Sequence, residues 1–170
     1  MNGYNRSYSH SPKVIKQLVI LNGYSPITGV IGISLVIPFL RKRLNKLDEY
    51  LAILSGLQRY RVEEFLENPE RYGSAERFLQ LAIEAVTDMG THLVADLELG
   101  VVNCYRDIPS LLAAAGYLPR DLEEKWFRMI GFRNTLVHDY LEIDRSIVHD
   151  VLQHHLEDLE AIKSVLASFL

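Results

Sequence analysis

The sequence has a single cysteine, Cys104, so it cannot form an internal disulfide or a cysteine-rich metal site. So few thiols are typical of a reducing compartment, and we expect a cytoplasmic protein. Long apolar runs are also scarce. The most apolar segment, residues 27–40, has 14 residues interrupted by two glycines and a proline. A membrane-spanning helix needs about 20 residues, so we expect no membrane partner.

The chain has no excess of positive charge either. Its formal net charge is −4, which gives no overall attraction to nucleic acid. Residues 1–40 carry three basic and no acidic side chains, whereas residues 41–170 carry 15 basic and 22 acidic ones. An RNA-binding surface would therefore have to be a local patch, for example one assembled between subunits.

The first 40 residues also hold three of the six prolines and four of the ten glycines. This shift in composition predicts a boundary, with residues 1–37 as an N-terminal extension outside the domain and residues 38–170 as the domain. Two other interpretations of the extension stay open. It could be an additional element that packs on the domain, or a segment that interacts with a membrane.

From Pro38 onward, apolar residues recur every three or four positions, which is typical of amphipathic helices. The first helix is expected to begin at Pro38, since proline suits a first helical turn, and to stop at Asn68-Pro69. The second is expected to begin with Ser74 as its N-cap and to end at Gly100. Gly90 inside it indicates the close approach of another helix.

Three further helices are expected. A short one covers residues 108–115, and a long one follows Pro119 and ends near 137–139. The last is N-capped by Asp144 and runs toward the C-terminus. No segment alternates as a strand would, and the connections are short. We therefore predict an all-α, four- to five-helix up-and-down bundle.

Polar chemistry is concentrated at the end of the helix that follows Pro119, in Arg133, Asn134, His138, Asp139 and Tyr140. Histidine has an unperturbed pKa near ~6.5 and can act as an acid or a base at neutral pH. Arginine presents a rigid fork of donors that suits phosphate. This combination fits metal-independent RNA cleavage through the 2′-hydroxyl, with Asn134 orienting either partner.

On an ideal helix His138 lies about 140° around from Arg133, so the two converge only if the helix bends or ends there. A single histidine per chain is also not enough to act as general acid and general base in the same reaction. A two-fold dimer whose two motifs face one cleft would supply a pair. We expect that cleft to be locally basic, with His138 at the mouth of a groove.

A purely structural interpretation of these residues stays open. A histidine and a tyrosine that close an apolar helix often form a cap or a core edge, and Arg133 could pair with an acid on the last helix. Asp88 and His92 lie four residues apart on one helix face and are too few for a metal site. We expect them to make a polar contact that lines the bundle or the cleft, and a supporting role near the active site stays open.

Outside the motif, three histidines near the C-terminus are expected at the surface: His149, His154 and His155. Tyr105 and Arg106 could touch RNA, although no pattern singles them out.

The motif Arg133-Asn134-x-x-x-His138-x-Tyr140 resembles the Arg-x4–6-His signature of the HEPN superfamily. More closely, it resembles the R-x4-H-x-Y pattern of the HepT-like toxin family. Two other stretches agree with that pattern: Met129-Ile-Gly-Phe before the motif, and Leu81-Ala-Ile-Glu-Ala-x-x-Asp-x-Gly-x-His92. The similarity covers about residues 38–168.

The resemblance implies a dimeric helical bundle and a metal-independent endoribonuclease toxin, with Arg133 and His138 catalytic, Asn134 supporting them, and no cofactor. Such toxins are similar to partners of MntA-type nucleotidyltransferase antitoxins, which can attach AMP to the motif tyrosine, here Tyr140. The added bulk and negative charge would stand where an RNA phosphate must sit. The implied partners are RNA, the antitoxin in a hetero-oligomer, and a second copy of the chain.

An alternative function is a non-catalytic, dimeric helical module that binds nucleotide and positions substrate for such a transferase. The intact Arg133 and His138 pair favours the nuclease.

Overall fold

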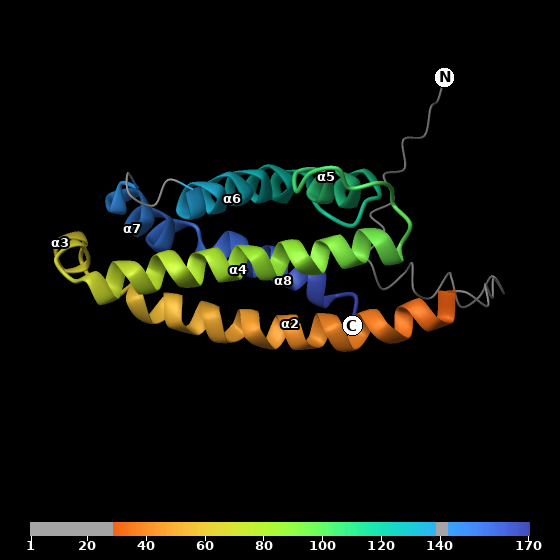
Figure 1. The fold of residues 1–170 in the computed structure, drawn as a ribbon, viewed down its shortest axis with the longest axis horizontal. Coiled ribbons are helices and arrows are strands. Elements are labelled where there is room, and N and C mark those ends of the chain that lie inside the picture. Colours follow the sequence, from red (N-terminus) through yellow and green to blue (C-terminus); the bar gives the residue numbers. More distant parts are fainter. Residues whose placement is uncertain (1–28, 139–142) are drawn as a thin grey trace, which may run out of the picture.

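The computed structural model describes residues 29–138 and 143–170, and this part of the chain is helical with no strand. In chain order the helices are α2 (Gly29–Leu57), α3 (Val62–Leu66), α4 (Pro69–Asp96), α5 (Asp107–Ala114), α6 (Arg120–His138), α7 (Arg145–His154) and α8 (Leu156–Ala167). In Figure 1, α2 runs one way along the molecule, α4 returns, α6 follows the direction of α2, and α7 with α8 returns again. The predicted all-α up-and-down bundle is confirmed.

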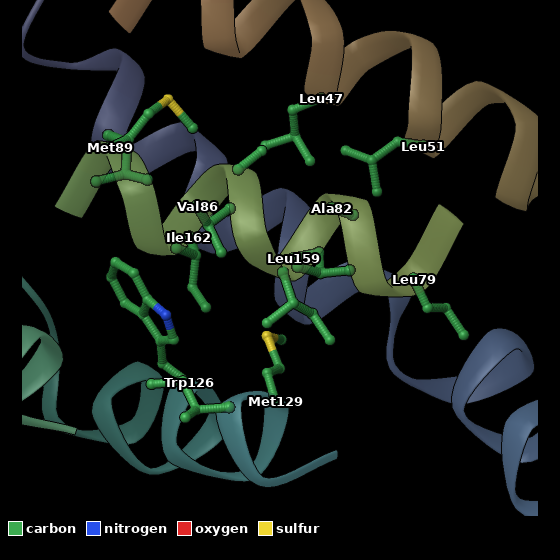
Figure 2. Packing of buried hydrophobic residues seen from close by; sticks show 14 of the residues in the cluster. Leu47, Leu51, Leu79, Ala82, Val86, Met89, Trp126, Met129, Leu159 and Ile162 are labelled. Atoms are coloured by element: carbon green, nitrogen blue, oxygen red, sulfur yellow. The ribbon is translucent and has the colours of Figure 1, made fainter. Parts of the chain in front are cut away.

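Helix α4 is the centre of the bundle, because it contacts every other described helix. Its apolar side chains meet Leu47 and Leu51 of α2 on one side and Trp126 of α6 on another (Figure 2). Small residues on α4 let these neighbours approach. Its buried apolar residues are Ala75, Leu79, Ala82, Ile83, Ala85, Val86, Met89, Leu93 and Val94.

The neighbours of Gly90 in α4 leave no room for a side chain at this position. A Cβ built at Gly90 would lie 2.6 Å from Cγ2 of Ile108 and 2.9 Å from Cη2 of Trp126. Both side chains are fully buried, so neither has open space to move into. The predicted close approach is confirmed, and it brings α5 and α6 onto α4.

The first expected helix differs from the observed one at both ends. Helix α2 begins at Gly29, so Pro38 lies inside it, at an exposed position, rather than in the first turn. The helix ends at Leu57, and residues 62–66 form the separate helix α3. The domain boundary placed between residues 37 and 38 stays a prediction, although the described helix crosses it.

The break between α2 and α3 is held by contacts with α7. Gln58 Nε2 donates a hydrogen bond to the carbonyl of Leu152 at 2.9 Å, and Gln153 Nε2 donates one to the carbonyl of Gln58, also at 2.9 Å. These partners lie more than 90 residues away in sequence. Local periodicity therefore could not indicate the break.

The expected N-cap of α4, Ser74, was wrong. The helix begins six residues earlier, where the side chain of Asn68 accepts a hydrogen bond from the N–H of Glu70 at 2.9 Å and Pro69 occupies the first turn. The Asn68-Pro69 pair that was expected to end one helix therefore starts the next. Asparagine as N-cap followed by proline is a favourable helix start, which explains the observed choice.

The expected last helix is two helices. Asp144 is its N-cap as predicted, since it accepts a hydrogen bond from the N–H of Ser146 at 2.8 Å. The chain leaves helical geometry at His155, with φ −125° and ψ 4°, and α8 follows. His149, expected at the surface, is half-buried with a ring nitrogen 3.0 Å from the carbonyl oxygen of Tyr60.

The expected end of the second helix at Gly100 was wrong, because α4 ends at Asp96 with Leu97 as its C-cap. Glu98 has a positive φ of 52°, and the N–H of Leu99 donates back to the carbonyl of Val94 at 3.0 Å, which closes the helix before Gly100.

Helix α5 closely matches the expected 108–115, and α6 follows Pro119 and is described to His138; the expected end near 137–139 stays a prediction, since it falls at the edge of the described residues. Asp139 and Tyr140 lie outside the described residues. Across residues 29–138 and 143–170, no helix combines the length and apolar character that crossing a bilayer requires.

Candidate active site

Arg133 lies on the face of α6 that meets α4, and it pairs there with Glu84. Its Nε and Nη2 donate hydrogen bonds to Oε1 of Glu84 at 3.1 and 2.7 Å. The side chains are 23% and 32% exposed, so water screens this pair less than it screens a surface pair. The expectation that Arg133 could pair with an acid on the last helix is wrong, since its partner lies on α4.

Glu84 belongs to a longer chain of hydrogen bonds. Gln80 Nε2 also donates to Oε1 of Glu84 at 2.9 Å, and Arg77 donates to Oε1 of Gln80 at 3.1 Å. Burial of the Glu84 carboxylate works to raise its pKa, but the hydrogen bonds from Gln80 and Arg133 outweigh burial and hold the pKa below its ordinary value. Glu84 is therefore ionised at neutral pH and fixes the guanidinium of Arg133.

Asn134 is exposed beside Arg133, and its Oδ1 accepts a long hydrogen bond of 3.4 Å from Nη1 of Arg133. This contact places Asn134 next to Arg133, and its supporting role stays a prediction. It also leaves the amide nitrogen of Asn134 facing away from the arginine.

His138 lies in the last turn of α6 and is exposed. Among the described residues, no hydrogen bond or ion pair reaches its ring. Five residues along a helix correspond to a rotation of about 140°, so His138 points away from the face that carries Arg133. The described contacts of one chain therefore do not bring the two residues together.

A shallow pocket lies beside Arg133 between α4 and α6. Its lining residues are Ile83, Glu84, Thr87, Asp88, Tyr105, Ile130 and Arg133. Asp88 forms an ion pair of 2.9 Å with Arg43 of α2. The two carboxylates of the pocket thus each face an arginine, and its charge is balanced rather than basic.

The expected polar contact between Asp88 and His92 is present, but through the backbone. His92 Nδ1 lies 3.0 Å from the carbonyl oxygen of Asp88. Its ring stacks on Phe39 of α2 with centroids 3.8 Å apart. No group of three or more potential metal ligands occurs among residues 29–138 and 143–170.

The sequence analysis missed one residue at this site, Glu84, and did not place a second, Tyr105, beside Arg133. Glu84 lies within the stretch that carries the family resemblance, four residues before Asp88 and four after Gln80, and this spacing places all three on one helix face. That spacing was the available signal. Tyr105 had been named only as a residue that could touch RNA, and no sequence pattern connects it to Arg133.

Comparisons with known proteins find one family model, described as ribonuclease HepT-like, which matches residues 41–166. The chain is similar to an mRNA nuclease HepT of Shewanella oneidensis, with 39% identity over 88 residues, or 52% of this chain and 66% of the relative. That match covers just under two thirds of the relative. The chain is also similar to a tRNA nuclease HepT of Aphanizomenon flos-aquae, with 26% identity over 75% of this chain and 87% of the length of that relative.

Solved structures agree with these relatives. A tri-AMPylated Shewanella oneidensis HEPN toxin in complex with an MNT antitoxin is 28% identical, with a TM-score of 0.70 over 75% of this chain and 96% of that chain. A toxin–antitoxin with AMP-PNP gives 27% identity and a TM-score of 0.70 over the same shares.

Proposed function

This chain belongs to the ribonuclease HepT-like family, and we propose that it is the toxin of a type VII-like toxin–antitoxin system. In this proposal it is a metal-independent endoribonuclease that acts in the cytoplasm through Arg133 and His138. The names of its relatives, an mRNA nuclease and a tRNA nuclease, support RNA as the substrate class. The solved complexes with an antitoxin support the toxin role.

The observation that carries the proposal is the fixed position of Arg133. A guanidinium has five N–H donors, and Glu84 and Asn134 accept three of them. The other two donors are available to a phosphate oxygen. Because Glu84 holds the group before RNA arrives, little ordering is needed at the moment of reaction, which is how preorganised donors stabilise a developing charge.

The proposed reaction is attack of a ribose 2′-hydroxyl on the adjacent phosphorus. A neutral imidazole removes the hydroxyl proton, the new O–P bond forms, and the bond to the 5′-oxygen breaks. A protonated imidazole supplies the proton that the leaving oxygen needs. The products are a 2′,3′-cyclic phosphate and a free 5′-hydroxyl, so atoms and charge balance.

Two imidazoles are needed, and each chain offers one His138 in the motif. We infer a homodimer with both motifs in one cleft, because His138 and Arg133 point in different directions within one chain. An arginine of one protomer would then act with a histidine of its partner. Asn134 would orient either group.

The proposed regulator is an MntA-like nucleotidyltransferase antitoxin that binds the toxin in a hetero-oligomer. It would transfer AMP to the hydroxyl of Tyr140, two residues after His138. The attached phosphate would repel the RNA phosphate from the same cleft. The tri-AMPylated relative supports this mode of neutralisation.

The test is cleavage of a mixed RNA by the purified protein in EDTA, with the His138→Ala variant measured beside it. Intact mass of each sample records any AMP on the protein, and circular dichroism records helicity. Cleavage by the wild type that is lost in the helical variant supports the nuclease. Cleavage that survives in His138→Ala would contradict the assigned role of His138.

A non-catalytic module that binds nucleotide beside a transferase is the second candidate. One observation favours it: the charge of Arg133 is already balanced by Glu84, and the pocket beside it is not basic. An unmodified wild-type protein that leaves RNA intact would select this alternative.

A further inference from the structure

Tyr105 is an exposed aromatic side chain beside the proposed catalytic arginine. It is 54% exposed, although it lines the same shallow pocket as Arg133. The residue lies in the connection between α4 and α5, far in sequence from the motif. Its position therefore results from the packing of α5 against α4, which Gly90 makes possible.

The turn that carries Tyr105 is held in place by Asp107. The Asp107 carboxylate accepts hydrogen bonds from the backbone N–H groups of Asn103 and Cys104 at 2.8 and 3.0 Å. The N–H of Asp107 donates back to the carbonyl of Cys104 at 3.0 Å. These bonds close the turn around Tyr105, so its ring is presented at the pocket by an ordered backbone.

The neighbouring residue, Arg106, points elsewhere. Its guanidinium lies 5.5 Å from the centroid of the Phe127 ring on α6. Arg106 does not line the pocket, whereas Tyr105 does. Of these two adjacent residues, which the sequence did not distinguish as RNA contacts, only Tyr105 therefore lies at the pocket.

The pocket beside this ring is too small to enclose a nucleobase, and Ile83 and Ile130 in its wall are buried. A base can therefore lie only against the exposed face of the Tyr105 ring, outside the pocket. Single-stranded RNA is commonly bound by an aromatic ring that stacks a base beside a cation that contacts the backbone. Tyr105 and Arg133 provide this pair.

We propose that Tyr105 stacks on a base of the RNA substrate, next to the phosphate that Arg133 contacts. This inference rests on the proposed ribonuclease function and adds a substrate-binding residue to it. Stacking on an aromatic ring tolerates any base, so Tyr105 strengthens binding without selecting a sequence.

The experiment compares Tyr105→Ala, Tyr105→Phe and the wild type as full-length proteins. Cleavage of a mixed-sequence RNA oligonucleotide gives kcat and KM, and fluorescence anisotropy of the labelled oligonucleotide gives its Kd. Val101→Ala is the matched control, since Val101 is 78% exposed in the same connection and does not line the pocket. Thermal melts show that each variant is folded.

We expect Tyr105→Ala to raise KM and Kd by about tenfold or more, which is within the usual strength of base stacking on an aromatic ring, with kcat little changed. Tyr105→Phe keeps the ring and should match the wild type, as should Val101→Ala. Unchanged KM and Kd in Tyr105→Ala would overturn the proposal. Equal losses in the Phe and Ala variants would also overturn it, since the hydroxyl would then be responsible.

The binding and cleavage measurements together distinguish a wrong assignment of Tyr105 from a wrong assignment of ribonuclease activity. A wild type that binds RNA without cleaving it would overturn the nuclease, and the Kd values would still test the stacking. A wild type that neither binds nor cleaves the oligonucleotide would overturn both.

Discussion

Arg133 of α6 donates two hydrogen bonds to one carboxylate oxygen of Glu84 on α4, from Nε at 3.1 Å and from Nη2 at 2.7 Å. The pair joins the helix that carries the motif to the central helix of the bundle. It also fixes the direction of the guanidinium. Glu84 is therefore a positioning residue for Arg133.

Glu84→Ala should lower RNA cleavage by about 10- to 100-fold, because a misplaced catalytic group loses rate steeply with distance. Glu84→Gln keeps an acceptor oxygen for Arg133 and should lose less. Steady-state kinetics measure both, and the loss should be mainly in kcat. Glu63→Ala, an exposed carboxylate on α3, serves as the control. A Glu84→Ala variant with wild-type kcat would contradict the positioning role.

The same carboxylate predicts a pH dependence of stability. Hydrogen bonds from Gln80 and Arg133 outweigh burial and hold the pKa of Glu84 below its ordinary value, so the folded state favours the ionised form. This contribution is fully present above the unfolded pKa of about 4.3 and is lost as pH falls through the lower folded pKa. Urea unfolding from pH 7 downward should show the wild type losing more stability than Glu84→Gln. If the difference in unfolding free energy between the wild type and Glu84→Gln stayed constant with pH, the lowered pKa of Glu84 would be contradicted.

Gly90→Ala should destabilise the fold, because the added Cβ would lie 2.6 Å from Ile108 and 2.9 Å from Trp126. Overpacking of this kind typically costs about 1–3 kcal/mol. Gly73→Ala is the matched control in the same helix, because nothing lies within 4 Å of a Cβ there, and it should stabilise by up to about 1 kcal/mol. Urea unfolding measures both changes, and equal effects at the two positions would contradict the close approach.

The start of α4 can be tested with two substitutions. Asn68→Ala removes the side-chain acceptor of the Glu70 N–H and should cost about 0.5–2 kcal/mol of unfolding free energy. Ser74→Ala falls inside the helix, where alanine is favourable, and should be neutral or stabilising. Thermal unfolding distinguishes them. A larger loss of stability in Ser74→Ala than in Asn68→Ala would indicate that Ser74 is the N-cap instead.

The sequence predicted the helical class, the Asp144 cap and the close approach at Gly90, because each depends on local spacing or on a single residue type. It did not predict the break after Leu57, because Gln58, which follows α2, is bonded to Leu152 and Gln153 of α7, far away in the sequence. At the start of α4 two local signals competed, and Asn68 with Pro69 prevailed over Ser74.

The motif from Arg133 to His138 was evident from residue order alone, since family resemblance and side-chain chemistry are properties of the linear chain. Its surroundings were not. Arg133 meets a glutamate 49 residues earlier, and Tyr105 reaches the same pocket from another connection. Periodicity shows which face of a helix is buried, but not which residue of a neighbouring helix faces it. That match depends on the rotation and axial register of packed helices, which are set when α4, α5 and α6 bury their side chains together.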